Sequence, residues 1–322
     1  MCIALISTAH PSYSLIIINN RDEFLHRPTS APDWWPAPNT HVLGSRDLAR
    51  ATQGTWMGIT THGKVAVLTN YREQTSSEAI GTHSRGRIVN SWLTTPPGER
   101  QTTHDFVQSV FASPEAKQVG GFSLVCGYIN EPLAIVSNRS EDMDHITWVA
   151  REKNTTRGLS NTSMDDRSWP KIVDGERYME QAIAEHVDKG EDEEQLITRL
   201  LDVLSIDTLP RLTKLEDASV DTYINHLRKS IFIPVIGAHS AHEQAAGEVD
   251  ATFVGDESKN PAAAQANGTN YSTGVYGTQK QTILLAQPNG RVRYFERTLY
   301  GNEAKAVPRG EGDRSFELTL AR

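Results

Sequence analysis

Cysteines and long hydrophobic runs are both scarce in this sequence. Only Cys2 and Cys126 occur among its 322 residues, too few for the disulfide framework of a small secreted domain. No apolar stretch approaches the ~18 residues that are needed to cross a bilayer. The first residues also lack the basic region and the small-residue cleavage site of a secretory signal. We therefore expect a cytoplasmic protein without a transmembrane segment.

Positive charge is also in short supply. The chain carries 32 Lys and Arg against 40 Asp and Glu, which gives a formal net charge of −8. Nucleic-acid-binding surfaces need clustered positive charge, and basic segments are what anionic lipids attract. We therefore expect no nucleic-acid partner and no simple electrostatic docking on lipid. A hydrophobic content of 38% still allows a substantial core, and we expect one domain over residues 1–322.

The N-terminus combines two reactive groups if Met1 is removed. Cys2 then carries both a thiol, with a reference pKa near ~8.5, and an α-amine, with a reference pKa near ~7.7–8.0. A nucleophile activated by the chain's own amine is the arrangement of N-terminal-nucleophile enzymes. The alternative is that Cys2 is an ordinary buried residue that opens a strand. Position alone leaves both interpretations open.

The first two apolar runs predict a hairpin that is buried on both faces. They are Cys2–Ser7 and Tyr13–Asn19, with a turn signal between them. In an antiparallel pair, residues 20–22 then lie opposite residue 2. This register places Arg21 and Asp22 beside the terminal thiol and amine, where Arg21 favours the thiolate and Asp22 holds the ammonium or orients a substrate amide. The alternative is a solvated charged turn.

A set of short motifs runs through most of the chain. They are Met1-Cys2, Asn20-Arg21-Asp22-Glu23-Phe24, Gly54-Thr55-Trp56-Met57-Gly58-Ile59, Leu68-Thr69-Asn70-Tyr71-Arg72-Glu73, Ser84-Arg85-Gly86 and Gly158-Leu159-Ser160-Asn161. In this order they resemble the NRDE-domain family, also called the transport and Golgi organisation protein 2 family. More distantly, the layout is similar to choloylglycine hydrolases and penicillin V acylases, which are N-terminal-nucleophile hydrolases. The resemblance implies an α+β fold, a four-layer αββα sandwich.

The resemblance also implies roles for two asparagines. In the resembled hydrolases, an Asn at the place of Asn70 donates to the oxyanion, and a second lies near the nucleophile at the place of Asn161. For Asn70, a plain turn-forming role is the alternative. The predicted catalytic residues are Cys2, Arg21, Asp22, Asn70 and Asn161.

The predicted substrate-binding residues are taken from the same motifs and from the last hairpin. They are Asn20, Glu23, Trp56, Tyr71, Arg85 and Lys280. Family members often carry Arg where this chain has Gln279, and Lys280 can replace the charge of that Arg but not its planar fork. This departure weakens the case for complete catalytic equipment.

The resemblance implies several functions. The family is associated with Golgi organisation and secretion, with haem trafficking and with acyl-CoA or lipid metabolism. We therefore expect a pocket at Cys2 that binds or processes an acyl-bearing or amphipathic small molecule, with an N-terminal cysteine amidase or thioesterase as the enzymatic form. The alternatives are a non-catalytic haem or lipid carrier and a factor for Golgi organisation. The location is cytoplasmic, with Golgi or mitochondrial association as further options.

The sequence indicates no metal site and no cofactor. His239 and His242 lie three residues apart, but a loop pair without further ligands is a weak metal signal. Their segment, residues 238–270, lacks periodicity and predicts a mobile loop. Trp34-Trp35, on a proline-rich connection, is either a lid over a pocket or a packed cover.

Other elements follow from periodicity and turn signals. The predicted strands are Val42–Gly44, Thr55–Thr60, Lys64–Thr69, Gly120–Tyr128, Pro132–Ser137, Ile146–Ala150, Ser230–Ile236, Ile283–Ala286 and Val292–Thr298. One helix is expected over Asp105–Ala112, capped by Thr102 or Thr103. Another starts at Pro170 and buries Ile172, Met179, Ile183 and Val187, and a third covers Leu196–Leu204.

Overall fold

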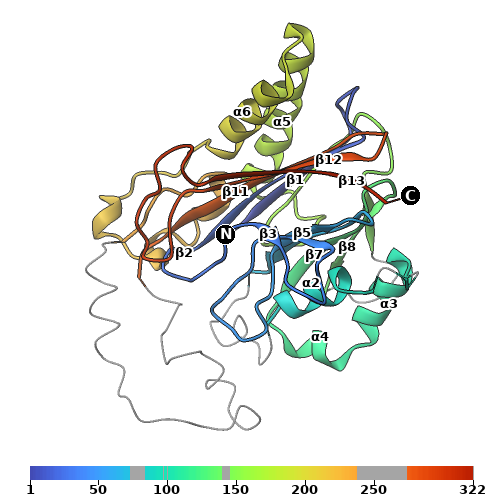
Figure 1. Cartoon of the computed structure of the whole chain (residues 1–322). Coiled ribbons are helices and arrows are strands. Elements are labelled where there is room, and N and C mark those ends of the chain that lie inside the picture. The colour runs from blue at the N-terminus through green and yellow to red at the C-terminus, as the bar shows by residue number, and fades with distance from the viewer. Residues whose placement is uncertain (73–83, 97, 100, 140–145, 238–273, 322) are drawn as a thin grey trace.

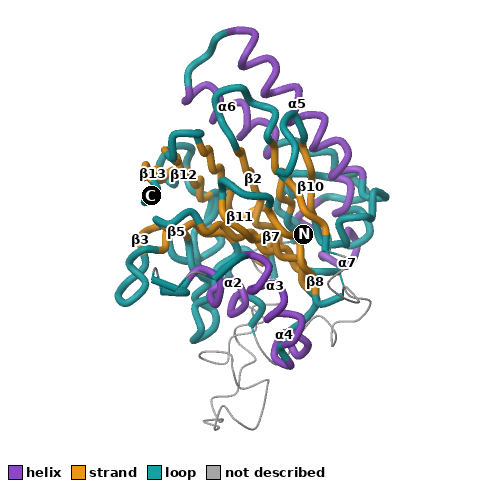
Figure 2. Tube along the Cα trace, turned by 90° about the vertical axis from the view of Figure 1, so that its right-hand side faces the viewer, coloured by secondary structure: helices purple, strands orange, loops and turns teal. Residues whose placement is uncertain are grey.

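The computed structural model describes residues 1–72, 84–96, 98–99, 101–139, 146–237 and 274–321. Within these residues two antiparallel sheets stack face to face, and helices cover the outer face of each. Figure 1 shows α5 (Pro170–Lys189) and α6 (Glu193–Leu204) on one side of the stack. The helices α2 (Gly86–Leu93), α3 (Thr103–Ala112) and α4 (Pro114–Gln118) lie on the other side, as Figure 2 also shows. The expected four-layer αββα sandwich is confirmed.

The first sheet has the strand order β10-β1-β2-β11-β12-β13. Its strands are β1 (Ile3–Ser7), β2 (Leu15–Phe24), β10 (Thr156–Leu159), β11 (Tyr276–Ala286), β12 (Arg291–Thr298) and β13 (Asp313–Thr319). The second sheet has the order β3 to β9. Its strands are β3 (Asp33–Trp34), β4 (Val42–Gly44), β5 (Met57–Thr60), β6 (Lys64–Asn70), β7 (Phe122–Tyr128), β8 (Leu133–Ser137) and β9 (Thr147–Val149).

The predicted N-terminal hairpin is confirmed, and it lies at the centre of the first sheet. Ile3 pairs with Asn20, and Ser7 pairs with Ile16. Side chains of a strand point alternately to its two faces. In β1, Ala4 packs between the two sheets, whereas Leu5 packs under α5 and α6. Burial on both faces explains why these strands read as unbroken apolar runs.

Helices α5 and α6 form an antiparallel cover over the first sheet. Gly190 ends α5 in the left-handed conformation (φ +62°), and Asp192 opens α6 with a capping box. Ile172, Met179 and Ile183 are buried as expected, but Val187 is 40% exposed. The expectation for Val187 was wrong because the buried face of α5 runs through Met179, Ala182, Ile183 and His186, which turns Val187 toward solvent.

Two further expectations on the second sheet's side are settled. Thr102 is the cap of α3, and its side chain and that of Asp105 form a capping box. Trp35 is 4% exposed and donates its indole N–H to the Gly44 carbonyl at 3.0 Å. The tryptophan pair is therefore a packed cover, not a lid.

The elements that differ from the sequence-based expectation include one predicted strand and one unexpected strand. Ser230–Ile236 is not a strand: only Ile236 forms an isolated bridge, with Tyr276, and Pro234 has no N–H for a ladder. The run is apolar because Ile231 and Ile233 pack against the underside of the first sheet's helical cover. Strand β13 was not expected at all.

The predicted loop over residues 238–270, with His239 and His242, lies outside the described residues. Of the helices that the structure describes, none is long and apolar enough to span a membrane.

Candidate functional site

Strand register places Cys2 between two of the predicted catalytic residues. Strand β1 pairs with β2 on one side, where Ile3 faces Asn20, and with β10 on the other, where Ala4 faces Leu159. Continued to residue 2, these registers set Cys2 opposite Arg21 and Asn161. Directly opposed residues point their side chains to the same face of a sheet. The three side chains therefore share the face between the two sheets.

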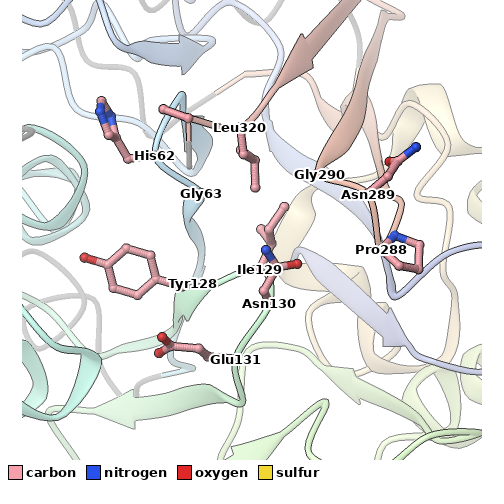
Figure 3. Close-up of a pocket in the computed structure, with 11 residues that line it drawn as sticks. His62, Gly63, Tyr128, Ile129, Asn130, Glu131, Pro288, Asn289, Gly290 and Leu320 are labelled. Carbon is pink, nitrogen blue, oxygen red and sulfur yellow. The ribbon is translucent and has the colours of Figure 1, made fainter.

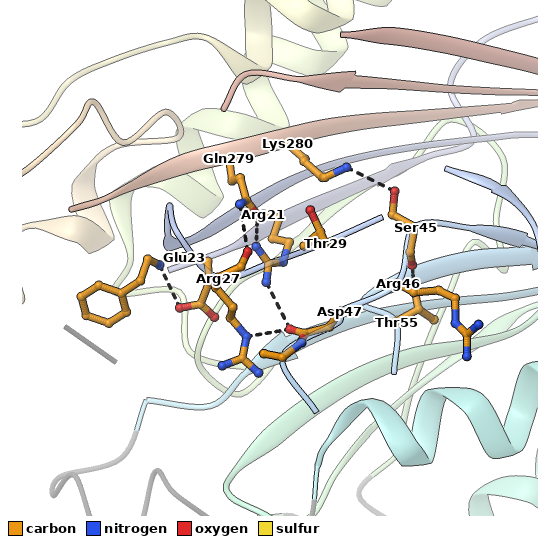
Figure 4. Close-up of polar contacts among 12 residues, drawn as sticks. Arg21, Glu23, Arg27, Thr29, Ser45, Arg46, Asp47, Thr55, Gln279 and Lys280 are labelled. Atoms are coloured by element: carbon orange, nitrogen blue, oxygen red, sulfur yellow. Dashed lines mark hydrogen bonds and ion pairs between the residues drawn. The ribbon is translucent and has the colours of Figure 1, made fainter. Parts of the chain in front are cut away.

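Arg21 lies against Trp56. Its polar partners Asp47 and Gln279 are drawn in Figure 4. Its guanidinium carbon is 4.6 Å from the centre of a Trp56 ring, and its Nη2 is 3.3 Å from Asp47 Oδ2. Its Nη1 donates to Gln279 Oε1. Burial alone would raise the pKa of Asp47, but Arg27 and Arg21 outweigh it and hold that pKa below its usual value. Arg21 is thus fixed in place as a buried cation.

A β-bulge explains how Gln279 reaches Arg21. In the β2–β11 pair, Thr278 faces Asp22 and Lys280 faces Arg21, so Gln279 is the extra residue. Bulges re-aim side chains, and this one directs an amide toward Arg21. Where the resemblance leads to the expectation of a second Arg, the chain has a neutral amide that accepts from Arg21.

Asp22 holds the chain's N-terminus on the opposite face of β2. The Met1 ammonium nitrogen is 3.4 Å from Asp22 Oδ2 and donates to the Tyr276 hydroxyl. Asp22 Oδ1 accepts a hydrogen bond of 2.7 Å from Thr278 Oγ1. Burial lowers the pKa of the Met1 amine, although the Asp22 carboxylate opposes this shift. The ammonium that Asp22 holds here is that of Met1, whereas the expectation concerned the amine of Cys2, so that role of Asp22 stays a prediction.

Lys171 is a member of the site that the sequence did not reveal. It is the second residue of α5 and is fully buried, and its Nζ donates to the Met1 carbonyl oxygen at 2.5 Å. Burial lowers the pKa of Lys171, and the nearby Asp22 and Cys2 act in the opposite direction. Two further missed residues are Tyr276, described above, and Ser160, whose hydroxyl donates to the Cys2 carbonyl at 2.7 Å.

The Cys2 thiol is buried in the chain that retains Met1. Its residue is 8% exposed, and its Sγ is 3.8 Å from the Asp22 carbonyl oxygen. Burial raises the pKa of Cys2, although the positive N-terminus counteracts this. The thiol is therefore protonated at neutral pH in this state. Cys126 is fully buried on the side of α2 and α3, and burial raises its pKa as well.

The two predicted asparagines lie where the two sheets meet. Thr69 Oγ1 donates to the Ser160 carbonyl at 2.9 Å, and the Arg72 amide donates to the Asn161 carbonyl at 2.8 Å. These bonds join the end of β6, with Asn70, to the end of β10, with Asn161. Asn161 is 4% exposed, and its Oδ1 has no hydrogen-bond partner among the described residues.

Several predicted substrate-binding residues are engaged elsewhere. Asn20 Nδ2 donates to the carbonyls of Leu204 and Ile231 at 2.8 and 2.9 Å, on the helical side of β2. Lys280 Nζ forms a buried ion pair of 2.9 Å with Glu296. These two contacts give Asn20 and Lys280 structural roles.

The remaining predicted residues surround the site more loosely. Glu23 accepts from the Phe24 amide at 2.9 Å. Tyr71 and Arg85 are half-buried, and Arg85 directly precedes α2. Trp56 is 6% exposed and its Nε1 has no hydrogen-bond partner within the described part of the chain.

A cavity of about 350 Å³ lies at the other end of the sandwich (Figure 3). It is formed by the turns that follow β5, β7 and β11, and its lining includes His62, Tyr128, Glu131 and Asn289. None of the predicted site residues lines it. No group of three or more His, Cys, Asp or Glu side chains that could hold a metal occurs among the residues that the structure describes.

The comparisons with known proteins decide the family. A family model described as transport and Golgi organisation 2 matches residues 1–301. The chain belongs to the transport and Golgi organisation 2 family. The human transport and Golgi organization protein 2 homolog is 27% identical over 315 residues, covering 96% of this chain and 94% of the human protein. The Bos taurus homolog is 26% identical over 299 residues, covering 91% and 89%.

This member of the transport and Golgi organisation 2 family is also similar to solved structures. One is the Caenorhabditis elegans ortholog of N-acylethanolamine-hydrolyzing acid amidase, with a TM-score of 0.44 and 14% identity over 71% of this chain and 98% of that one. Another is a variant of the conjugated bile acid hydrolase of Clostridium perfringens, with a TM-score of 0.44 and 10% identity over 99% and 98%.

Proposed function

We propose that this chain, once Met1 has been removed, is an N-terminal cysteine hydrolase for an acyl-bearing small molecule. One observation carries the proposal: the strand register that sets Cys2 between Arg21 and Asn161, with the Asp22 carboxylate at the N-terminal amine. An acyl amide or thioester is the substrate class, because the attack of a thiolate on a carbonyl is the reaction that an N-terminal cysteine supports.

Removal of Met1 gives the site its base. Removal of Met1 frees Asp22 Oδ2 from the Met1 ammonium at 3.4 Å, and the new α-amine forms one residue further along the chain. Asn161, opposite Cys2 in the register, has a buried Oδ1 with no hydrogen-bond partner among the described residues. The neutral amine takes the thiol proton, and Arg21 stabilises the resulting thiolate. The thiolate attacks the acyl carbonyl, and the amine returns the proton to the leaving nitrogen or sulfur. Water then hydrolyses the acyl-cysteine thioester and releases the acid.

The oxyanion of the tetrahedral intermediate needs a donor at the same end of the sandwich. Asn70 is the candidate, since the hydrogen bonds between β6 and β10 bring its strand end to Asn161. Removal of such a donor costs roughly ~10²–10³ in rate.

The test compares three chains that all begin at residue 2, as verified by mass spectrometry. Wild-type protein should release acid from members of a panel of acyl amides and acyl thioesters, and Cys2→Ala should abolish this release. Cys126→Ala is the matched control, because Cys126 lies in the core under α2 and α3, and it should retain the wild-type rate. The proposal fails if the wild-type chain with a free Cys2 amine releases no acid, or if Cys2→Ala releases it equally fast.

A second candidate is a carrier on the same fold. The observation that favours it is the 8% exposure of Cys2 in the chain that retains Met1, where the Cys2 nitrogen is an amide and cannot act as a base. In that form the protein binds an amphipathic molecule, such as a lipid, acyl-CoA or haem, without turnover. The expected result is then tight binding that Cys2→Ala leaves unchanged. The family's name is compatible with a cytoplasmic protein that acts at the Golgi.

A further inference from the structure

Met1 occupies a buried site as a ligand would. It is 8% exposed, and the three parts of the residue each have a partner. Its ammonium contacts the Asp22 carboxylate and the Tyr276 hydroxyl, and its carbonyl oxygen accepts from Lys171 Nζ at 2.5 Å. Its side chain lies in an apolar cluster of residues from α5, the segment that follows α6 and β11. That cluster includes Trp169, Ile172, Leu209, Tyr223, Ile233 and Tyr276.

The polar groups that contact Met1 are buried side chains, not surface ones. Asp22 is 4% exposed, Lys171 is 0% exposed and Tyr276 is 8% exposed. They come from β2, α5 and β11, which are three separate elements. Buried groups of this kind are costly to leave without partners. A chain that begins at Cys2 loses the Met1 partners of all three together.

The charges of the site favour a zwitterion. Asp22 is in contact with an ammonium, whereas the hydrogen bond that the structure gives the Lys171 ammonium goes to the neutral carbonyl of Met1. A carboxylate at the place of that carbonyl would pair with Lys171, and with the Cys2 amine beside it. A simple fatty acyl chain would fill the apolar cluster, but it would supply no ammonium to replace the Met1 donor that Asp22 Oδ2 and the Tyr276 hydroxyl now have.

We propose that the site filled by Met1 is, in the chain that begins at Cys2, a binding site for a free L-α-amino acid with an unbranched apolar side chain of the size of methionine. Asp22 and Tyr276 bind its ammonium, Lys171 binds its carboxylate, and the cluster around Tyr223 takes its side chain. The inference rests on the processed N-terminus of the proposed function, but it requires no turnover.

The experiment compares two forms of the full chain. The Cys2-first form is released from a ubiquitin fusion by a co-expressed deubiquitinase, and the Met1-retaining form is made by cell-free translation with methionine aminopeptidase inhibited. The first residue of each is verified by mass spectrometry. Isothermal titration calorimetry with L-methionine and L-norleucine should show binding to the Cys2-first form alone, because Met1 fills the site in the other. D-methionine and N-acetyl-L-methionine should bind at least 10-fold more weakly.

Variants of the Cys2-first form locate the site. Lys171→Met and Tyr276→Phe should each weaken L-methionine binding at least 10-fold. Lys189→Met is the control from the same helix, since Lys189 is an exposed residue at its C-terminal end, and should bind as wild type does. If Lys171→Met does not fold, Tyr276→Phe, which removes only a hydroxyl, decides the question. The inference is overturned if the Cys2-first form does not bind L-methionine, if both forms bind it equally, or if a folded Lys171→Met or Tyr276→Phe keeps the wild-type affinity.

A Cys2→Ala chain that begins with Ala keeps the α-amine and should bind L-methionine as tightly as wild type does. Binding and acid release are therefore measured independently, and failure of one does not imply failure of the other.

Discussion

Among the residues that the structure describes, Lys171 and Lys280 are two fully buried lysines with opposite surroundings. Lys280, between the two sheets, has the Glu296 carboxylate at 2.9 Å and also donates to the Ser30 carbonyl at 2.9 Å and to Thr298 Oγ1 at 3.2 Å. Lys171, in the first turn of α5, donates to the neutral carbonyl of Met1. The first charge is paired by residues that stay in the fold, so its role is structural. The second depends on a residue that processing can remove, which makes it available to a ligand.

The largest effect is expected from breaking the paired lysine. Glu296→Gln keeps the shape of the side chain but leaves the Lys280 charge buried without a counter-ion. Loss of one partner of a buried pair costs about 3–5 kcal/mol of unfolding free energy. Urea denaturation monitored by tryptophan fluorescence measures it. The double variant Lys280→Met with Glu296→Gln should recover part of the loss, and a loss below about 1 kcal/mol in the single variant would contradict a structural ion pair.

An intermediate effect is expected from pH at the other lysine, in the chain that retains Met1. Burial lowers the pKa of Lys171 below 10.5 and that of the Met1 amine below 8.0, so the unfolded chain binds more protons and stability rises with pH. We expect unfolding free energy to increase from pH 7 to pH 9, by at most about 1.4 kcal/mol per pH unit for each group. The pKa values of Cys2 and Tyr276 are raised, so they reverse the trend only above about pH 9.

Lys171→Met is the variant that separates these two groups. It should keep the rise due to the Met1 amine, which ends near pH 8, and should lose the rise that continues above it. Urea denaturation at pH 7, 8, 9 and 10 shows this difference, since the contribution of Lys171 extends up to its ordinary pKa of 10.5. Identical pH profiles for wild type and Lys171→Met would contradict the lowered pKa of Lys171.

The smallest effect on unfolding free energy is expected from an exposed ion pair, which serves as the reference for the two buried lysines. Arg293 Nη2 is 2.7 Å from Glu194, whose side chain is 66% exposed. Water screens such pairs, and we expect Glu194→Gln to change unfolding free energy by less than about 0.5 kcal/mol. The same urea titration measures it, and a loss above about 1 kcal/mol would show that exposure does not separate weak from strong charge pairs in this fold.

The local part of the site could be predicted from the sequence. Cys2, Arg21 and Asp22 belong to one hairpin, and antiparallel pairing across one turn fixes which residues meet. Lys171 and Tyr276 could not be predicted in this way. Helix α5 meets the N-terminus by packing on the sheet, and β11 meets it by pairing with β2 from a distant part of the chain. A signal for Lys171 was present, since it stands between Pro170 and the buried Ile172 at the start of a helix.

Apolar runs predicted the strands correctly where a segment is both buried and hydrogen-bonded to a neighbouring strand. Ser230–Ile236 is buried without pairing as a strand, and periodicity cannot distinguish these two cases. Strand β13 is the reverse case: it pairs with β12 along its length but is an edge strand, with Glu317 and Arg314 exposed, so its sequence carries little apolar signal. The hydrogen bonds of Asn20 to backbone carbonyls also could not be predicted from the sequence. Their acceptors, Leu204 and Ile231, lie far from Asn20 along the chain.

Because Met1 is buried beneath α5, removal of Met1 competes with folding during synthesis. An exopeptidase needs a free chain end, but in the folded protein the terminal amine is enclosed by Asp22, Tyr276 and a helix whose lysine appears 170 residues later. At about 5–20 residues per second, translation leaves on the order of 10–30 s between the emergence of the first residue and that of Lys171. A ribosome-bound peptidase can remove Met1 only during that interval. A chain that is not cleaved in this time folds with Met1 in the buried site. Codon usage and peptidase abundance, rather than the folded structure, would then set the ratio of the two forms in a cell.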